Sequence, residues 1–301
     1  MSDSEAGPSD ASDVLYDERN HLAVVTLNRP HKMNTLTEGM VDGVAEAIER
    51  ATASRSVRAI ILRGAGPALT GGYDLAPEAG DLESTWSNPF DAPRPTSRAG
   101  AWDPVRDYQW MNRNVKRFMT IWECPKPVLG QIHGWAIGGA TDLILCCDLL
   151  FMAEDAFIGY APSRIYGTPT TMMWVYRLGL EHAKQFLLSG DAIDAATAHR
   201  IGLVSYVYPP EELSEKIEAF AARYQHIPAN QLALNKLLVN QAFDNMGLRT
   251  SQLIGTVFDG IARHTEEAYQ WMEGVKSQGL RDVVRDRDAP FQDYGQRPKN
   301  R

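Results

Sequence analysis

The sequence predicts an α/β fold that ends in a helical C-terminal segment. Two apolar runs of strand length, residues 22–27 and 57–62, flank a helical stripe of apolar residues over 40–48, and a right-handed crossover unit requires this order. Beyond residue 209 the spacing of the apolar residues becomes helical. We therefore expect a folded core over residues 13–211 and a helical segment over residues 212–301.

The N-terminal part of the chain carries local signals. Residues 1–12 are acidic and contain no apolar run, so they are expected to form a disordered tail. Thr35 and Glu38 have capping-box spacing, which places the start of the first helix beside them. Residues 57–62 are rich in β-branched side chains and are followed by a Gly-Ala-Gly-Pro turn, as expected for a strand.

A stretch over residues 76–104 is rich in proline and shows no sustained period. Its prolines are Pro77, Pro89, Pro93, Pro95 and Pro104. Loops of this length inside a compact domain are usually functional lids or disordered segments, and the aromatic residues Trp86, Phe90 and Trp102 argue against a purely solvated segment. The sequence thus predicts a lid loop, followed by a helix over residues 105–122.

The most informative stretch runs from Pro127 to Asp148 and combines a short apolar strand, a glycine turn and the start of an apolar helix. The first amides of such a helix have no internal partner and lie at the positive end of its dipole, so they can receive a developing negative charge. Asp142 follows Gly139 by three residues, about one helical turn. Its carboxylate and these amides can therefore border one pocket.

Composition excludes several classes of function. The chain has 301 residues with 30 Lys and Arg against 38 Asp and Glu, a net charge of −8, so it has no footprint for nucleic acid or for a polybasic membrane contact. The three cysteines, of which Cys146 and Cys147 are adjacent, are expected to be reduced core thiols. We expect neither a metal nor a dinucleotide, because no ligand cluster, phosphate-binding loop or dinucleotide fingerprint has the required spacing.

The N-terminus shows neither the positively charged start nor the apolar stretch of a secretory signal. No apolar run reaches the length needed to cross a bilayer. We therefore expect a cytoplasmic protein without a membrane partner.

Six segments carry a resemblance to a known family. They are Val24-Val-Thr-Leu-Asn-Arg-Pro30 with Met33-Asn-Thr-Leu36, Val57-Arg-Ala-Ile-Ile-Leu-Arg-Gly64, Ala68-Leu-Thr-Gly-Gly-Tyr-Asp-Leu75, Pro127 to Asp148, Leu187-Leu-Ser-Gly-Asp-Ala-Ile193, and Ala198-His-Arg-Ile-Gly-Leu-Val-Ser-Tyr-Val-Tyr-Pro209. No single segment is specific, but six in order over roughly 200 residues are hard to obtain by chance. Together they resemble the crotonase superfamily, also called the enoyl-CoA hydratase/isomerase family.

The resemblance implies a crotonase-like spiral of repeated strand-strand-helix (ββα) units over the core. It implies that the C-terminal helical segment packs over the active site and builds a homotrimer, often doubled to a homohexamer. The implied substrate is an acyl-CoA thioester, with CoA as part of that substrate and no separate cofactor. The activity that the family favours is hydration of an enoyl-CoA, a lyase reaction of fatty acid metabolism.

Family enzymes hold the thioester oxygen between two backbone amides as an enolate forms, and one such donor is worth about 3 kcal/mol. The resemblance assigns these amides to Tyr73 and Gly139, and the acid/base group to Asp142. The family usually has a small residue at the first position and Glu at the third, so Tyr73 could redirect the pocket and Asp142 has a shorter reach. The alternative for Asp142 is a first-turn carboxylate, worth about 0.3 to 1 kcal/mol through the helix dipole.

The resemblance also implies substrate contacts. Arg29 and Lys32 follow the first strand near the expected nucleotide, where basic side chains would offset phosphate charge; exposed charges beside Pro30 are the alternative. The remaining expected contacts are Gly72, Trp135, Gly138, Pro162 and Ser163. Tight packing of strand and helix is the alternative reason for Gly138.

Hydratases normally carry a second catalytic carboxylate, but here the matching position falls on Pro162 or Ser163. Hydration needs one group to position water and another to manage the α-carbon proton, whereas moving a double bond can use a single carboxylate. An enoyl-CoA isomerase, a retro-Claisen C–C hydrolase and a noncatalytic acyl-CoA binder therefore stay open. Other polar residues could compensate, and the sequence singles out none of them: Asp103, Asp107, Glu123, His133, Tyr160, Arg164 and Tyr166.

Overall fold

The structure, a computed structural model, describes residues 12–74 and 102–294. The expected tail over residues 1–12 and the expected lid over 76–104 therefore lie almost wholly outside the described residues, and so do Trp86 and Phe90. At the C-terminal edge of the predicted lid, Trp102 stacks on His264 with the ring centroids 4.7 Å apart. This edge thus packs against the C-terminal helical segment.

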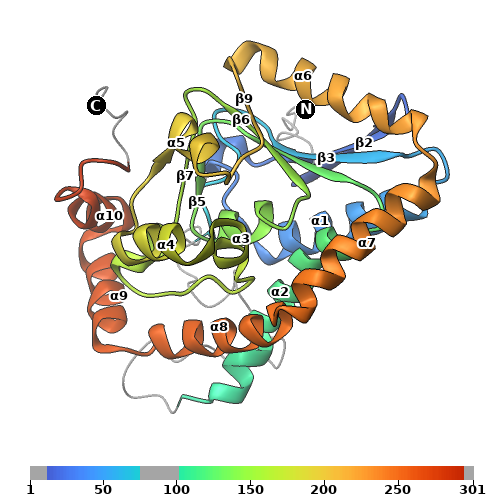
Figure 1. Ribbon diagram of the computed structural model, residues 1–301. Coiled ribbons are helices and arrows are strands. Elements are labelled where there is room, and N and C mark those ends of the chain that lie inside the picture. Colours follow the sequence, from blue (N-terminus) through green and yellow to red (C-terminus); the bar gives the residue numbers. More distant parts are fainter. Residues whose placement is uncertain (1–11, 75–101, 295–301) are drawn as a thin grey trace, which may run out of the picture.

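A six-stranded sheet forms the centre of the core, in the order β1-β2-β3-β4-β6-β9 (Figure 1). Its strands are β1 (Val14–Arg19), β2 (Leu22–Leu27), β3 (Ala59–Gly64), β4 (Val128–Ile132), β6 (Leu149–Ala153) and β9 (Tyr206–Tyr208). β1 pairs antiparallel with β2, and the other pairs are parallel. Every residue of β2 is buried, as expected for a parallel strand covered on both faces. The predicted strand at 22–27 is confirmed, and the one at 57–62 begins two residues later.

A smaller sheet has the order β5-β7-β8. Its strands are β5 (Trp135–Ile137), β7 (Phe157–Gly159) and β8 (Ile193–Asp194). One isolated bridge connects it to the earlier chain, because Thr70 pairs in parallel with Ala136; a second bridge pairs Leu36 in parallel with Tyr73. The chain that follows β3 is thereby held against β5 and the turn after it.

Ten α-helices lie in the described part of the chain. They are α1 (Glu38–Ala53), α2 (Pro104–Glu123), α3 (Gly139–Ile144), α4 (Met173–Ser189), α5 (Ala195–Arg200), α6 (Pro210–Ala222), α7 (Ala229–Asn245), α8 (Leu248–Ala262), α9 (Glu266–Gln278) and α10 (Leu280–Asp288). Short 3₁₀ turns are η1 (Pro30–Lys32), η2 (Ala161–Arg164) and η3 (Arg223–His226). The helix predicted from the stripe over 40–48 is confirmed as α1, and the one over 105–122 as α2.

The predicted capping box of α1 is wrong. Thr37, rather than Thr35, accepts a hydrogen bond from the Met40 amide at 3.2 Å. The cause is the preceding residue: the Leu36 N–H donates to Gly72 O at 2.7 Å, which keeps the chain out of the helix through Leu36. The helix can therefore start only after that bridge.

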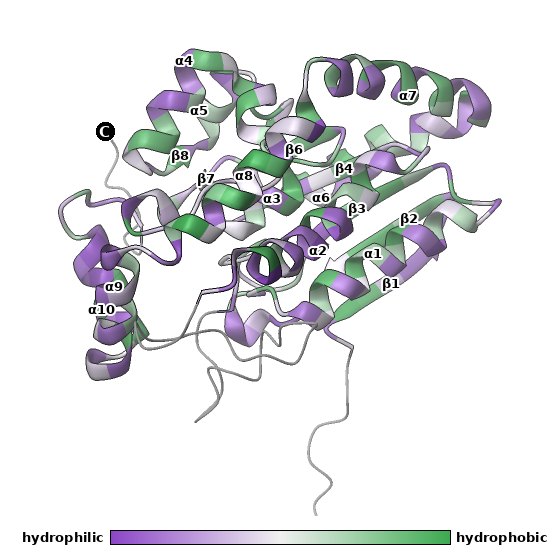
Figure 2. Cartoon of the chain, turned by 90° about the horizontal axis from the view of Figure 1, so that it is seen from below, coloured by the Kyte–Doolittle hydropathy of each residue, from purple (hydrophilic) through white to green (hydrophobic). Residues whose placement is uncertain are grey.

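The predicted C-terminal helical segment is confirmed and begins with α6. α6 packs on β3, β4 and β6, whereas α7 to α10 run around the outside of the core (Figure 1). Hydrophobic stretches lie along α7 and α8 (Figure 2). Their exposed apolar side chains are Leu234, Leu237, Leu238, Val239, Met246, Leu253, Ile254, Val257, Phe258 and Ile261. An apolar surface of this extent on two adjacent helices is typical of an interface.

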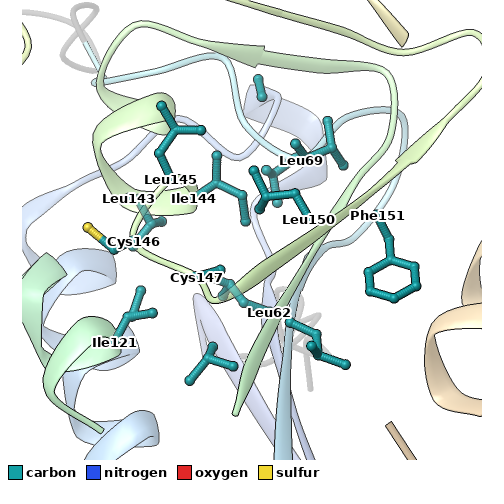
Figure 3. Packing of buried hydrophobic residues seen from close by; sticks show 14 of the residues in the cluster. Leu62, Leu69, Ile121, Leu143, Ile144, Leu145, Cys146, Cys147, Leu150 and Phe151 are labelled. Atoms are coloured by element: carbon teal, nitrogen blue, oxygen red, sulfur yellow. The ribbon is translucent and has the colours of Figure 1, made fainter. Parts of the chain in front are cut away.

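The interior around α3 is a single apolar cluster (Figure 3). Cys146 and Cys147 lie in it with Ile144 and Leu150, and both are free thiols, as is the buried Cys124. Burial raises the pKa of Cys147 to about 12 and also raises the pKa of Cys146. The expectation of reduced core thiols is confirmed.

A buried guanidinium joins the end of α10 to η2. Arg164 donates to Asp288 at 3.0 Å and to both carboxylate oxygens of Asp293 at 2.8 and 2.7 Å. The side chain of Arg164 is 3% exposed, and its guanidinium lies 3.6 Å from the centroid of the Phe291 ring. The C-terminal helices are thus anchored immediately next to Pro162, one of the two positions expected for a second catalytic acid.

Candidate active site

Two main-chain segments run side by side at the candidate site. The Thr70 N–H donates to Trp135 O at 3.1 Å, and the Ile137 N–H donates to Thr70 O at 3.3 Å. Gly72 has a φ of +99°, and a Cβ atom there would lie 2.8 Å from Ile137 O and 3.8 Å from Gly139 N. Only glycine permits this approach, which brings the end of the first segment against the start of α3.

Gly139 is the first residue of α3, so its N–H has no acceptor within the helix. Gly138 makes the turn before it, with φ +57° and ψ −122°, a conformation that favours glycine. Thr141 Oγ1 donates to Gly138 O at 2.7 Å, and Trp174 Nε1 donates to Thr141 Oγ1 at 2.9 Å. Buried side chains therefore hold this turn in place, as a fixed backbone donor requires.

The ring of Tyr73 lies across Gly139. A Cβ atom on Gly139 would stand 2.5 Å from Tyr73 Cε2 and 2.6 Å from Tyr73 Cδ2. The Tyr73 hydroxyl reaches Met111 Sδ on α2 at 4.0 Å. The side chain thus forms an aromatic wall beside the turn, at the position where the family resemblance implies a small residue.

Asp142 is 1% exposed. Its Oδ1 accepts two hydrogen bonds from Thr171, one from the backbone N–H at 2.9 Å and one from the hydroxyl at 2.8 Å. Burial disfavours the charged form and raises the pKa of Asp142 from 3.8 to about 6, although the bonds from Thr171 act in the opposite direction. The carboxyl group thus changes charge close to neutral pH.

The C-terminal segment contacts Asp142 indirectly, through Thr171. Gln252 on α8 donates to Thr171 O at 3.1 Å, and Thr171 in turn holds Asp142. Gln252 Nε2 also contacts Met119 Sδ on α2 at 3.1 Å. A groove of about 420 Å³ between α2 and α8 has Gln252 and Met119 in its lining. Sequence patterns could not identify Thr171 or Gln252, since neither belongs to a recognisable motif.

Pro162 and Ser163, the two positions expected for a second acid, lie in η2. A Cβ atom on Gly138 would stand 3.2 Å from Pro162 Cγ, so the proline packs directly on the glycine turn. Neither residue carries a carboxylate. That one of them occupies the place of the family's second acid stays a prediction.

Tyr160, which immediately precedes η2, is 4% exposed. Its pKa is raised well above the usual value by burial first, then by the negative charges of Asp142 and Tyr73 in their ionised forms, while Arg263 opposes the shift. A phenol in this environment stays protonated. Tyr160, Tyr73, Asp142 and Arg263 therefore lie around one region of the site.

The expected substrate contacts away from the turn are engaged with the protein. Arg29 donates to Asp74 Oδ2 and to Thr35 O, both at 2.9 Å, and its side chain is 12% exposed. Lys32 ends η1 and is partly buried. Trp135 stacks on Phe157 at 5.0 Å between ring centroids. Arg29 thus has a structural role, and CoA contacts of all three residues stay predictions.

Most of the other polar candidates have structural partners. Asp103 caps α2 by accepting from Val105 N at 3.0 Å, and Asp107 forms a partly buried ion pair with Arg263 at 2.8 Å. The remaining contacts are His133 with Gly66 O, Glu123 with Arg249, and Tyr166 with Met272 Sδ. None of these contacts places a second carboxylate at the glycine turn.

Within residues 12–74 and 102–294, no group of three or more His, Cys, Asp and Glu side chains is arranged to hold a metal ion. In the same part of the chain, no helix combines the length and apolar character needed to cross a bilayer.

Comparisons with protein families and with solved structures point to the same family. The model of the enoyl-CoA hydratase/isomerase family matches residues 17–90 and 101–279. A crystal structure of an enoyl-CoA hydratase from Mycobacterium smegmatis superposes with a TM-score of 0.88 and 36% identity, covering 96% of this chain and 99% of that one.

Two relatives represent two activities. A crotonyl-CoA hydratase from Syntrophomonas wolfei is 28% identical over 241 residues, covering 79% of this chain and 83% of its own length. The mitochondrial Delta(3,5)-Delta(2,4)-dienoyl-CoA isomerase of Rattus norvegicus is 33% identical over 156 residues, covering 50% of this chain and 45% of its own length. The likeness thus extends to both hydratases and isomerases.

Proposed function

This chain belongs to the enoyl-CoA hydratase/isomerase family, and from that membership we propose that it is an acyl-CoA enzyme of the hydratase type. The proposed substrate is an enoyl-CoA thioester. The proposed active site is the glycine turn with its oxyanion-stabilising amides at Tyr73 and Gly139 and its acid/base group at Asp142. The reaction requires no cofactor beyond the CoA that arrives as part of the substrate.

One observation carries the proposal: Asp142 is buried one helical turn after Gly139, and its pKa is raised to about 6. A general base works best when its pKa lies near the working pH. A carboxylate that served only the helix dipole would be expected at the surface with an ordinary pKa, since such an interaction is favourable in water.

In the proposed hydration, the two amides bind the thioester oxygen. A water molecule adds its oxygen to the β-carbon while the Asp142 carboxylate accepts the water proton. The electron pair of the double bond moves onto the thioester oxygen, and the amides stabilise the resulting enolate, each by about 3 kcal/mol. Protonation of the α-carbon then completes the addition.

Isomerisation is the second candidate, and the residues in η2 favour it. Pro162 and Ser163 provide no second carboxylate, and one acid/base group can take a proton from one carbon of an enoyl chain and return it to another. The similarity to a dienoyl-CoA isomerase supports this alternative. Retro-Claisen cleavage and binding without turnover are the remaining possibilities, and the experiment below separates them.

The test is to incubate the protein with a panel of enoyl-CoAs and to follow both the conjugated absorbance and the product mass. A gain of one water indicates hydration, an unchanged mass with a moved double bond indicates isomerisation, and chain cleavage indicates the retro-Claisen route. Asp142→Asn is expected to lose activity, whereas Asp155→Asn, a change at an exposed carboxylate, is expected to retain it. Equal rates in wild type and Asp142→Asn would remove Asp142 from the mechanism.

The proposal includes a cytoplasmic homotrimer or homohexamer. The apolar side chains exposed on α7 and α8 support self-association, because a monomer seldom leaves so many on adjacent helices. Arg29 and Lys32 are proposed to lie near the CoA nucleotide.

A further inference from the structure

The Tyr160 hydroxyl is a donor that the proposed mechanism does not use. Tyr160 as a whole is 4% exposed, and within the described residues its hydroxyl makes no hydrogen bond; burial and neighbouring charges alone act on it. The hydroxyl oxygen itself is not fully enclosed. The buried ring therefore holds in place a hydroxyl that is free to bond to a molecule occupying the site.

The surroundings of this hydroxyl place it beside the missing acid. A Cβ atom on Gly167 would lie 3.7 Å from Tyr160 Oη and 3.2 Å from Pro162 Cβ. A Cβ atom on Gly138 would lie 3.2 Å from Pro162 Cγ. Pro162 therefore has the glycine turn on one side and shares the neighbourhood of Gly167 with the Tyr160 hydroxyl.

The charges around Tyr160 determine which role it can take. Asp142 and Tyr73 both raise the pKa of the phenol, and Arg263 lowers it less than burial raises it. The hydroxyl therefore carries its proton at neutral pH. A protonated phenol suits the donation of a proton, whereas the raised but accessible pKa of Asp142, about 6, suits its acceptance.

We propose that Tyr160 is a catalytic residue that donates a proton to the α-carbon of the enolate and so replaces the second carboxylate. The inference rests on the proposed function. As the Tyr160 O–H bond breaks, the electron pair of the enolate forms the new C–H bond and the thioester carbonyl returns. The tyrosinate oxygen then takes the proton that Asp142 accepted, from water in a hydration or from the γ-carbon in an isomerisation, so both side chains end as they began.

The test compares Tyr160→Phe with Tyr206→Phe in D₂O, using the enoyl-CoA that the wild-type protein turns over best. Tyr206 lies in β9 and stacks on Phe151, so it controls for the loss of a phenol oxygen elsewhere. We expect Tyr160→Phe to lower kcat by about 10²- to 10⁴-fold, the usual worth of a proton donor, with KM nearly unchanged. Removing a hydroxyl that makes no hydrogen bond within the protein should not lower the unfolding temperature.

The position of deuterium in the product distinguishes proton donation from structural support. The wild-type protein should place deuterium on one face of the α-carbon, whereas Tyr160→Phe should place it on both faces because solvent then supplies the proton. An unchanged kcat, or a lowered kcat with the wild-type facial preference, would overturn the inference. If the wild-type protein converts no thioester at all, the proposed function itself fails, and that result is evident before any variant is made.

Discussion

Thr171 holds one carboxylate oxygen of Asp142 with two hydrogen bonds, from its backbone N–H at 2.9 Å and from its hydroxyl at 2.8 Å. Both bonds stabilise the charged form, and burial destabilises it more, so the pKa of Asp142 lies at about 6. A threonine outside every recognisable motif therefore helps to set the protonation of the proposed base.

Thr171→Val removes the hydroxyl bond and keeps the backbone one. We expect the pKa of Asp142 to rise above about 6, since the charged form loses a partner. The acid limb of the kcat profile should move to higher pH, and kcat/KM at neutral pH should fall. A pH–rate profile checks this. The control is Thr168→Val, whose hydroxyl donates to Gly255 O instead; coincident acid limbs in the two variants would contradict the role of Thr171.

Asp142→Asn should change the pH dependence of stability in a defined direction. Because the folded pKa is raised above 3.8, protonation stabilises the native state fully below about pH 4, and this contribution is lost as the pH rises through about 6. Above that window the charged carboxyl group lowers the free energy of unfolding of the wild-type protein by on the order of 3 kcal/mol, at about 1.4 kcal/mol for each pKa unit. Denaturant unfolding of both proteins across this pH range measures the difference in that free energy. The asparagine variant should gain stability relative to wild type with rising pH, and a constant difference would refute the raised pKa.

Gly139→Ala should be tolerated only when Tyr73 is shortened. The added methyl group would stand 2.5 Å from Tyr73 Cε2, and overpacking of this kind costs roughly 1–3 kcal/mol. In a double-mutant cycle, Tyr73→Ala should relieve most of that cost. A purely additive cycle, measured by urea unfolding, would show that the ring does not press on Gly139.

Tyr73→Ala alone should widen substrate choice, because the ring forms a wall beside the turn. We expect kcat/KM to rise for branched or ring-bearing acyl-CoA thioesters relative to short linear ones. Competition between two such thioesters gives the ratio directly. An unaltered ratio would mean that the acyl group does not pass the tyrosine.

Arg164→Ala should be strongly destabilising. It removes the buried guanidinium that Asp288 and Asp293 share. Asp288 keeps its contact with Arg287, but Asp293 loses its cationic partner, and breaking a buried ion pair on one side typically costs about 3–5 kcal/mol. Arg285→Ala is the matched control and lies on α10, the helix that ends at Asp288, since Arg285 pairs with Asp282 at the surface and such pairs contribute little. Similar urea midpoints for the two variants would exclude Arg164 as an anchor.

Leu237→Glu, combined with Leu238→Glu, should reduce the assembly to monomers. Both side chains lie on α7 and are more than half exposed, and a buried unpaired charge is incompatible with an apolar interface. Size-exclusion chromatography with light scattering measures the mass of the assembly in solution. Gln241→Glu, at an exposed polar position of α7, should leave the assembly intact. A wild-type protein that is already monomeric would refute the proposed oligomer.

Local patterns predicted the elements but not every contact between them. β2 occupies the six residues marked by the apolar run at 22–27, and the glycine turn before α3 falls where the spacing placed it. The start of α1 was misplaced because the bridge from Leu36 to Tyr73 is a tertiary contact. A capping signal cannot register such a contact.

In the candidate site, too, local patterns were predictable from the sequence and tertiary contacts were not. Gly139 and Asp142 share one short motif, and both lie in α3 as their spacing predicted. Thr171 and Gln252 were missed, since their positions beside Asp142 depend on contacts that join α3 to the loop before α4 and that loop to α8, 29 and 81 residues apart in sequence. Such supports become visible only when the chain is folded.

The reactivity of the three native thiols can be used to measure how often this protein unfolds locally or globally. Cys124, Cys146 and Cys147 are all buried, and Cys146 Sγ donates to the Asp142 carbonyl oxygen of α3, the helix that bears the proposed base. An alkylating reagent must therefore wait for that region to come apart before it can react. The rate of labelling would report how often the interior of the molecule is exposed to water, without any cysteine being introduced by mutation.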